Sequence, residues 1–262
     1  MNINEKNMLN LLSQLTDLGA LDAVKAEFEA EGTRTDEFLR LLDIGKRANT
    51  KIALKIGGCE ALRDIADSKQ FGVDYVIGPM IETPYALGKF IDAKNRIYSD
   101  IEQQDTKFLF NLETITGFKN LEGLIEIASG NSQAIGVVLG RVDFVGSLGW
   151  ERDAVNSSKV VDYAKKVAES ARNNSLELVI GGGINLESWN PLREILSIHL
   201  SRFETRKIVF SSRSLENQKI FEKALSLAGS FELNWLENKM GHYVKLSLED
   251  ETRLIMLRKR WG

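Results

Sequence analysis

The sequence predicts one α/β domain folded as a (β/α)8 TIM barrel. Apolar strand-like runs alternate with helical patterns along the chain, which is typical of βαβ units and a parallel sheet. The length of 262 residues suits a single barrel of this kind. With only three prolines and no Gly/Ser-rich linker, nothing marks a boundary between domains. We therefore expect a single domain over residues 1–262, with a barrel core at 21–215 and a C-terminal helical region at 216–262.

The elements follow in a regular order. A helix over Glu5–Leu18 precedes the barrel and is placed to cover one of its ends. Seven β-like runs are expected at Asp22–Glu29, Lys51–Ile56, Asp74–Met80, Lys107–Glu113, Ala134–Arg141, Glu177–Gly181 and Lys207–Ser211. Helical patterns separate and follow them at Thr35–Arg47, Glu60–Lys69, Pro84–Ile97, Phe118–Ala128, Ser157–Asn173, Leu186–Leu196 and Leu215–Ala228.

The end of the chain carries the weakest signals. A faint strand pattern at Tyr243–Leu248 is the candidate for the eighth strand. Glu249–Trp261 then forms an amphipathic helical pattern. Two interpretations of this helix stay open, because its apolar side can pack on a neighbouring subunit or on its own barrel.

Strand alternation predicts which side chains enter the barrel, because successive residues of a strand point to opposite faces. In the run at 107–113, Leu109, Asn111 and Glu113 share a face opposite a purely apolar one. The mixed face is expected to line the interior, since the apolar face must meet the surrounding helices. Lys55 ends the interior face of its strand, and Lys25 and Glu27 share the interior face of the first strand.

Composition excludes several classes of function. With 34 basic and 37 acidic residues the net charge is −3, which argues against a nucleic-acid binder. The single cysteine, Cys59, excludes an internal disulfide and fits the reducing cytoplasm. The segment Met1–Asp22 resembles no targeting peptide, and no apolar run approaches the 18 residues of a membrane span. A small acidic metabolite is the expected partner.

The most informative pair of residues is Glu113 with Asp143. Each follows a predicted strand, and the carboxyl ends of neighbouring barrel strands meet at one mouth, where barrel enzymes hold their active sites. Two carboxylates there suit a hard divalent cation such as Mg²⁺, with positions left for substrate and water. The alternative is that both residues merely cap helices.

Other polar groups gather at the same predicted mouth. Lys55 suits stabilisation of an enolate oxygen, a Schiff base, or a structural ion pair with Glu27, Glu29 or Glu113. Glycine turns at 57–58 and 181–183 expose backbone N–H groups that suit a carboxylate or phosphate, and the hydroxyl of Ser147 lies in a further loop. Only two histidines occur, so a zinc site or a Ser-His-Asp triad finds no support.

Four short motifs resemble, in order and spacing, the HpcH/HpaI aldolase and citrate lyase β-subunit family. They are Lys55-Ile56-Gly57-Gly58, Gly78-Pro79-Met80-Ile81-Glu82-Thr83, Asn111-Leu112-Glu113-Thr114, and Gly140-Arg141-Val142-Asp143 with Ser147-Leu148-Gly149. The resemblance runs from about Ala23 to about Ser212. It implies a phosphoenolpyruvate/pyruvate-type barrel that cleaves or forms a C–C bond beside an enolate, with Mg²⁺ or Mn²⁺ held by Glu113 and Asp143.

The same resemblance assigns further roles. It implies that backbone amides near Val142 and Asp143 hold a substrate carboxylate and that Asn111 lies beside the metal ligand. It also implies a homo-oligomer, a trimer or hexamer, in which C-terminal helices are exchanged. The chain departs from the family at two points. Lysine stands at 55 where arginine is usual, and the expected catalytic histidine has no counterpart. The candidate bases are then a metal-bound hydroxide, a group of the substrate, or one of Glu29, Glu31 and Glu82.

These observations predict a metal-dependent carbon–carbon lyase or aldolase that acts through the enolate of a pyruvate-like 2-oxo acid or a related carboxylate. Lys55, Glu82 and Arg141 are the predicted catalytic residues. Substrate is expected to contact Asn111, Val142, Ser147, Gly57 and Gly58. Two alternatives remain: phosphoryl or enolpyruvyl chemistry on phosphoenolpyruvate, with Gly181–Gly183 as phosphate cradle, or a catalytically silent barrel that serves in binding or assembly.

Overall fold

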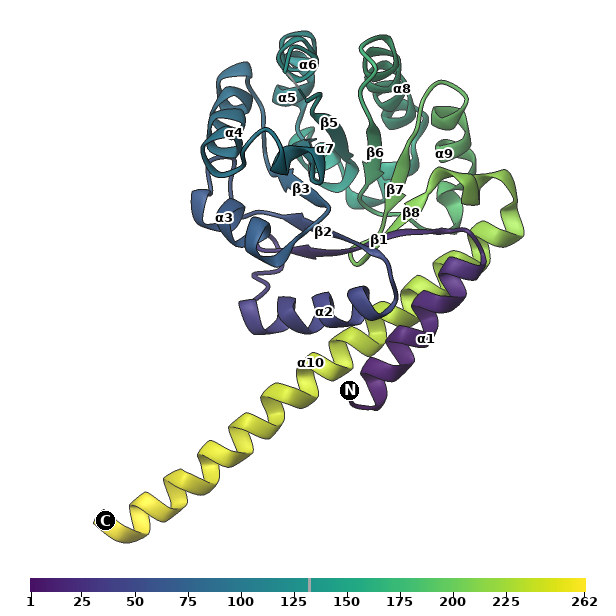
Figure 1. Ribbon diagram of the computed structural model, residues 1–262. Helices are drawn as coiled ribbons and strands as arrows, with labels where there is room; N and C mark the ends of the chain where they lie inside the picture. The colour runs from purple at the N-terminus through teal and green to yellow at the C-terminus, as the bar shows by residue number, and fades with distance from the viewer. Residues whose placement is uncertain (132) are drawn as a thin grey trace.

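The computed structural model describes residues 1–131 and 133–262 as a closed eight-stranded barrel ringed by helices (Figure 1). The strands are β1 (Leu21–Glu27), β2 (Lys51–Lys55), β3 (Tyr75–Gly78), β4 (Lys107–Leu112), β5 (Gly136–Gly140), β6 (Leu178–Gly181), β7 (Arg202–Glu204) and β8 (Ile208–Ser211). They pair in chain order, and β8 closes the barrel on β1. The predicted barrel is therefore confirmed.

Helices fill the connections. They are α1 (Ile3–Asp17), α2 (Thr35–Arg47), α3 (Leu62–Phe71), α4 (Pro84–Ile97), α5 (Ile115–Lys119), α6 (Leu121–Ser129), α7 (Arg141–Ser147), α8 (Ser158–Asn173), α9 (Trp189–Leu196) and α10 (Gln218–Trp261). Local chemistry sets their starts: Thr83 caps α4 through the Ala86 N–H, and Pro84 opens the helix. Within the part of the chain that the structure describes, none of these helices combines the length and apolarity needed to cross a bilayer.

The predicted strand faces are correct. Ala23, Ala53 and Leu109 lie in a small apolar cluster inside the barrel. Their sequence neighbours Val24, Leu54 and Phe110 point outward into the main core, between the strands and the helices. Since Asn111 and Glu113 share the inner face with Leu109, the alternation carries them toward the carboxyl end of the barrel interior.

The last strands depart from the expected pattern. The run at 207–211 was expected to be a seventh parallel strand, but β7 precedes it and β8 pairs antiparallel with both β7 and β1. Three residues, 205–207, join β7 to β8. A connection this short allows only a hairpin, because a parallel crossover needs a dozen or more residues. The weak strand expected at Tyr243–Leu248 is wrong, since those residues lie within α10.

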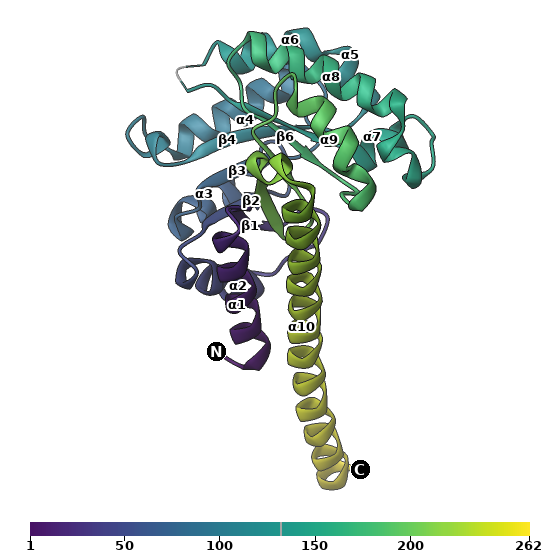
Figure 2. The same ribbon diagram turned by 90° about the vertical axis from the view of Figure 1, so that its right-hand side faces the viewer.

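The reversal of β8 sets the course of α10. Phe221 near the start of α10 packs on Phe203 of β7, with ring centroids 5.8 Å apart. Trp235, further along, lies 5.2 Å from the Nζ of Lys207, next to the mouth end of β8. The helix therefore runs along the outside of the barrel from the end opposite the mouth toward the mouth. It lies beside α1, and its second half projects beyond the barrel (Figures 1 and 2). Residues 249–261 are exposed and do not pack on their own barrel.

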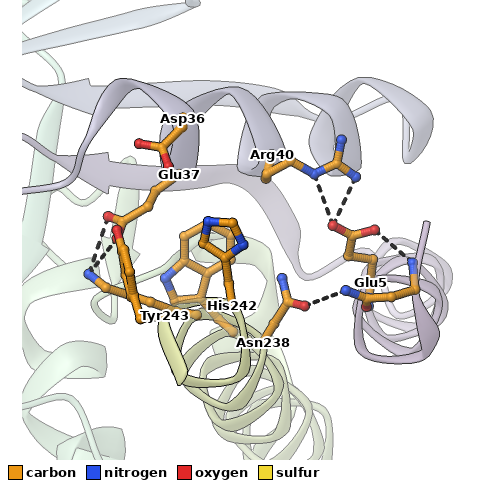
Figure 3. Close-up of a pocket in the computed structure, with 10 residues that line it drawn as sticks. Glu5, Asp36, Glu37, Arg40, Asn238, His242 and Tyr243 are labelled. Carbon is orange, nitrogen blue, oxygen red and sulfur yellow. Dashed lines mark hydrogen bonds and ion pairs between the residues drawn. The ribbon is translucent and has the colours of Figure 1, made fainter. Parts of the chain in front are cut away.

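The point where α10 leaves the barrel is fixed by polar contacts with α1 and α2 (Figure 3). Glu37 of α2 accepts hydrogen bonds from the Tyr243 hydroxyl at 2.5 Å and the Lys239 ammonium at 3.2 Å. Glu5 of α1 pairs with Arg40 of α2 at 2.8 Å. A cavity of about 210 Å³ lies among these residues. Because the carboxylates of Glu5 and Glu37 are already paired, the joint is a structural one.

Candidate active site

A cavity of about 320 Å³ opens at the carboxyl ends of the strands, where catalytic residues of barrels gather. Five of the predicted site residues line it: Lys55, Asn111, Glu113, Val142 and Asp143. They come from β2, β4 and the start of α7, and from the residue that follows β4. The structure thus brings together the metal-ligand candidates and the lysine. Gly57, Gly58, Glu82, Arg141 and Ser147 do not line the cavity.

Glu113 is the most constrained carboxylate of the site. Its side chain is 2% exposed, and both carboxylate oxygens have polar partners. Oε1 accepts the Met80 N–H at 2.8 Å, while Oε2 accepts the Asn111 amide at 2.7 Å and lies 3.3 Å from the Lys55 ammonium. Gly140 leaves room for it, because a Cβ there would come within 2.8 Å of Oε2. Glu113 is therefore held toward the cavity and does not cap a helix; Thr114 caps α5 instead.

Lys55 carries a full positive charge in this site. Its Nζ lies 3.0 Å from a Glu29 oxygen and 3.3 Å from Glu113, so the ion pairs expected as one alternative are present. Burial alone would lower the pKa of Lys55, but Glu113, Glu29 and Glu27 outweigh burial and raise the pKa above its ordinary value. A protonated ammonium is no nucleophile, whereas it suits stabilisation of a negatively charged oxygen.

The oxygen atoms near Glu113 fit a hard cation. Asn111 is 5% exposed, and its Oδ1 has no hydrogen-bond partner among the described residues. Asp143 lies in the first turn of α7, is exposed and lines the same cavity. Residues 1–131 and 133–262 contain no group of three His, Cys, Asp or Glu side chains placed to hold a metal ion, at the mouth or away from it. An ion here would rely on two carboxylates, with substrate and water completing its oxygen ligands.

A buried ion cluster forms the floor of the cavity, and the sequence did not single it out as part of the site. The Nζ of Lys25 lies 2.5 Å from Glu204 and 3.0 Å from Glu27. Burial would lower the pKa of Lys25, but Glu204 and Glu27 raise it well above its usual range. Lys25 and Glu27 were recognised as interior residues. Glu204 was missed because its short strand was missed, and so was Arg206 in the following turn.

Arg141 has a structural place. It is 1% exposed, and its guanidinium donates to the carbonyls of Gly181, Gly182 and Val155 and to the Asn156 side chain. Burial lowers the pKa of Arg141 to about 10, so the group is still charged at neutral pH. Since its donors are committed to the protein, Arg141 ties the loop after β6 to α7, and the predicted contact with substrate has no support in this geometry.

The remaining predicted residues also serve local structure. The Ser147 hydroxyl donates to the Phe144 carbonyl at 2.7 Å and accepts the Ile115 N–H at 2.8 Å. Glu82 accepts the Thr114 hydroxyl at 2.5 Å. The Gly57 N–H donates to Asp64, and the Gly58 carbonyl accepts the Ala61 N–H, so both glycines shape the turn before α3.

The loop after β6 reaches the mouth as the glycine pattern suggested. Gly182 and Gly183 have positive φ values, of 81° and 65°, and both line the cavity. A Cβ on Gly182 would come within 2.7 Å of the Val142 nitrogen and 2.9 Å of the Arg141 nitrogen. Glycine is therefore required where this loop passes the first amides of α7.

Comparisons with known proteins agree with this architecture. Solved structures similar in fold include an HpcH/HpaI aldolase from Desulfitobacterium hafniense (11% identity, TM-score 0.58, covering 75% of this chain and 82% of that one). An HpcH/HpaI aldolase/citrate lyase family protein from Burkholderia cenocepacia matches at 10% identity and a TM-score of 0.58, and the match covers 91% of this chain and 90% of that one. RipC from Yersinia pestis matches at 13% identity and a TM-score of 0.53, and the match covers 79% of this chain and 88% of that one.

At these identities the likeness to solved structures shows the fold alone. No curated protein sequence matches the chain. The family comparison is more specific, because residues 23–182, more than half of the chain, match the model of HpcH/HpaI aldolase/citrate lyase. That span contains the mouth residues from Lys25 to Asp143. The match supports a lyase-type activity, and the chain belongs to the HpcH/HpaI aldolase/citrate lyase family.

Proposed function

We propose that the protein is a metal-dependent carbon–carbon lyase that acts through the enolate of a 2-oxo acid. The observation that carries the proposal is the juxtaposition of Glu113, Asp143 and the protonated Lys55 around one cavity at the barrel mouth. Membership of an aldolase and citrate lyase family supports the same class of reaction. The single cysteine and the absence of a basic excess are consistent with a cytoplasmic enzyme of small acids.

Each side chain has a defined part in this proposal. Glu113 and Asp143 would hold Mg²⁺ or Mn²⁺, and a bound ion supplies Lewis-acid stabilisation of a developing enolate. Lys55 adds positive charge near the same oxygen, and Asn111 leaves its free Oδ1 to accept a hydrogen bond from substrate or water. The amides beside Gly182 suit the substrate carboxylate.

Among the three candidate bases, Glu29 fits best. Glu31 is paired with Lys207, and Glu82 accepts a hydrogen bond from Thr114 outside the cavity. Glu29 contacts the cavity-lining Lys55 at 3.0 Å, and its Oε2 has no hydrogen-bond partner of good geometry among the described residues. Glu29 does not itself line the cavity, so its proposed role as base rests on its contact with Lys55, which does.

The test is metal-dependent proton exchange at the methyl group of pyruvate in D₂O, followed by NMR. We expect exchange with added Mg²⁺, and its loss with EDTA or in Glu113→Gln and Asp143→Asn. Glu122→Gln, which changes an exposed acid on α6, is the matched control. Exchange that survives both EDTA and Glu113→Gln eliminates the proposal. Release of phosphate from phosphoenolpyruvate would favour phosphoryl chemistry, and no Mg²⁺ binding at millimolar concentration would favour a silent barrel.

We also propose that the chain forms a homo-oligomer through the free half of α10. Leu236, Met240, Val244 and Leu248 recur every four residues along this half and are between 53% and 64% exposed. An apolar stripe on a projecting helix is typical of an association surface. Glu249–Glu251 and Arg258–Arg260 give the same segment separate acidic and basic ends, which suits pairing with a second copy.

A further inference from the structure

Two arginines stand at the rim of the mouth cavity. Arg152 begins a 3₁₀ turn, Arg152–Asn156, that follows α7. Arg206 lies in the hairpin turn between β7 and β8, which exists only because β8 runs antiparallel. Both side chains are exposed to solvent, and both line the cavity that holds Glu113 and Asp143. The two loops therefore bring two guanidinium groups to one opening.

These arginines differ from the other cations of the cavity. Lys25 and Lys55 are each paired with two glutamates. Neither Arg152 nor Arg206 forms a side-chain ion pair or hydrogen bond with any residue of the described ranges 1–131 and 133–262. Glu204 lies two residues before Arg206 in the chain, but its carboxylate forms an ion pair with Lys25. Guanidinium groups bind carboxylates and phosphates in a planar, two-pronged manner, so this pair is suited to an anion.

The charges of the cavity support the same conclusion. Its lining carries four cations and four acids: Lys25, Lys55, Arg152, Arg206, Glu27, Glu113, Asp143 and Glu204. The lysines are neutralised by glutamates, and the proposed function assigns Glu113 and Asp143 to a divalent ion. The positive charge that remains is carried by the two arginines. Neither forms an ion pair within the described residues; Arg206 acts on Glu27 at longer range, but Glu27 is already paired with Lys25.

We infer that Arg152 and Arg206 bind a second anionic group of the substrate, remote from its 2-oxo acid end. This inference rests on the proposed function and narrows its substrate class to dianions, in which the second group is a carboxylate or a phosphate. A carboxylate offers two coplanar oxygens to a guanidinium, and a phosphate offers oxygens in a tetrahedral arrangement, so either group can accept two parallel hydrogen bonds. A monoanion such as pyruvate would leave the arginine pair unused.

Calorimetric titration of the full chain with Mg²⁺, at one fixed ionic strength, tests the inference. The ligands are pyruvate, 2-oxoglutarate and 3-phosphonopyruvate, so the two dianions separate the carboxylate from the phosphate source. We expect at least one dianion to bind about 10-fold or more tightly than pyruvate. In Arg152→Gln/Arg206→Gln the ratio of dianion to pyruvate affinity should fall to near one.

Arg213→Gln, which changes an exposed arginine outside the cavity, should keep the ratio of the unaltered chain. Equal affinity for pyruvate and both dianions, or a ratio that survives the double substitution, overturns the inference. A second titration with succinate and propionate involves no enolate chemistry. If pyruvate exchange fails while an arginine-dependent preference for succinate persists, the anion site stands and the proposed lyase reaction falls.

Discussion

Lys55 is the lysine that lies against Glu113 in the mouth cavity. Its ammonium touches Glu29 and Glu113, and these carboxylates keep the pKa raised. A lysine in this state supplies charge to an oxygen and does not condense with a ketone. The arginine that the sequence resemblance leads us to expect here would offer a planar fork, whereas lysine offers a compact point charge.

This assignment predicts the outcome of two experiments. Lys55→Met should lower metal-dependent pyruvate exchange by about 100-fold, because one electrostatic contact to the enolate is lost, and Lys55→Arg should recover part of the rate. Borohydride added with pyruvate should leave the mass of the protein unchanged. A mass increase equal to one reduced pyruvate, absent in Lys55→Met, would reveal an imine and contradict the assignment.

Glu27 gives a prediction for the dependence of stability on pH. Burial raises its pKa, but Lys25, Lys55 and Arg206 outweigh burial and lower the pKa below the ordinary 4.5. A depressed carboxyl pKa stabilises the fold above pH 4.5, and the contribution disappears as the pH falls through the lower folded-state value. Glu27→Gln should therefore reduce the free energy of unfolding by about 2 kcal/mol at neutral pH.

Denaturant titrations at pH 7 and pH 3 measure this effect. The difference between Glu27→Gln and the unaltered chain should shrink at the lower pH. Glu122→Gln serves again as the control, because its carboxylate is exposed and should contribute little at either pH. A difference that is the same at both values would refute the role of the Glu27 charge.

At the residue scale, sequence alternation could predict which side chains face the interior but not what their polar atoms contact. Asn111 and Glu113 follow from the pleat, since every second residue of β4 points inward. Arg141 stands one residue past β5, and its guanidinium donates to four acceptors, two at the end of β6 and its loop and two in the 3₁₀ turn that follows α7. Those acceptors come from residues 155, 156, 181 and 182, so no local pattern could indicate them.

At the scale of elements, α10 combines two environments in one helix. Phe231 is fully buried against the barrel, whereas Leu236 on the next turn is 59% exposed. Phe231→Ala should reduce the free energy of unfolding by about 3–5 kcal/mol. Leu236→Ala should change it by less than about 0.5 kcal/mol in the monomer. Guanidinium titrations at low protein concentration compare the two variants, and equal effects would contradict the described packing.

The strands show where prediction from sequence ends. Long elements such as α2 and α4 follow from helical periodicity and a cap, and their predicted limits match the structure. β7 has only three residues, Arg202-Phe203-Glu204, with one apolar side chain between two charged ones. Such a segment carries no period that separates it from a loop. It is a strand only because it pairs with β6 and β8, and β6 ends about twenty residues earlier in the chain, so no local pattern indicates the pairing.

At the scale of the whole molecule, the projecting half of α10 determines the expected assembly. Sedimentation velocity of the full chain should show a homo-oligomer, a trimer or hexamer if the assembly follows the family. Met240→Glu/Val244→Glu should yield monomers, because it places charge in the exposed apolar stripe. Lys245→Glu, on the same exposed segment, is the control. A full-length chain that remains monomeric at high concentration would remove the proposed interface.

The course of α10 past the mouth of the barrel also decides how the protein can be attached to a support. Asn2 donates a hydrogen bond to Asn238, so the first residues of the chain lie beside the point where this helix leaves the barrel. From Trp235 the remaining turns extend roughly 40 Å beyond it. Coupling to a sensor chip through Gly262 would keep the barrel away from the chip by the length of the free helix, with its mouth facing the chip surface. Coupling near Met1 would instead bring the mouth close to the chip surface.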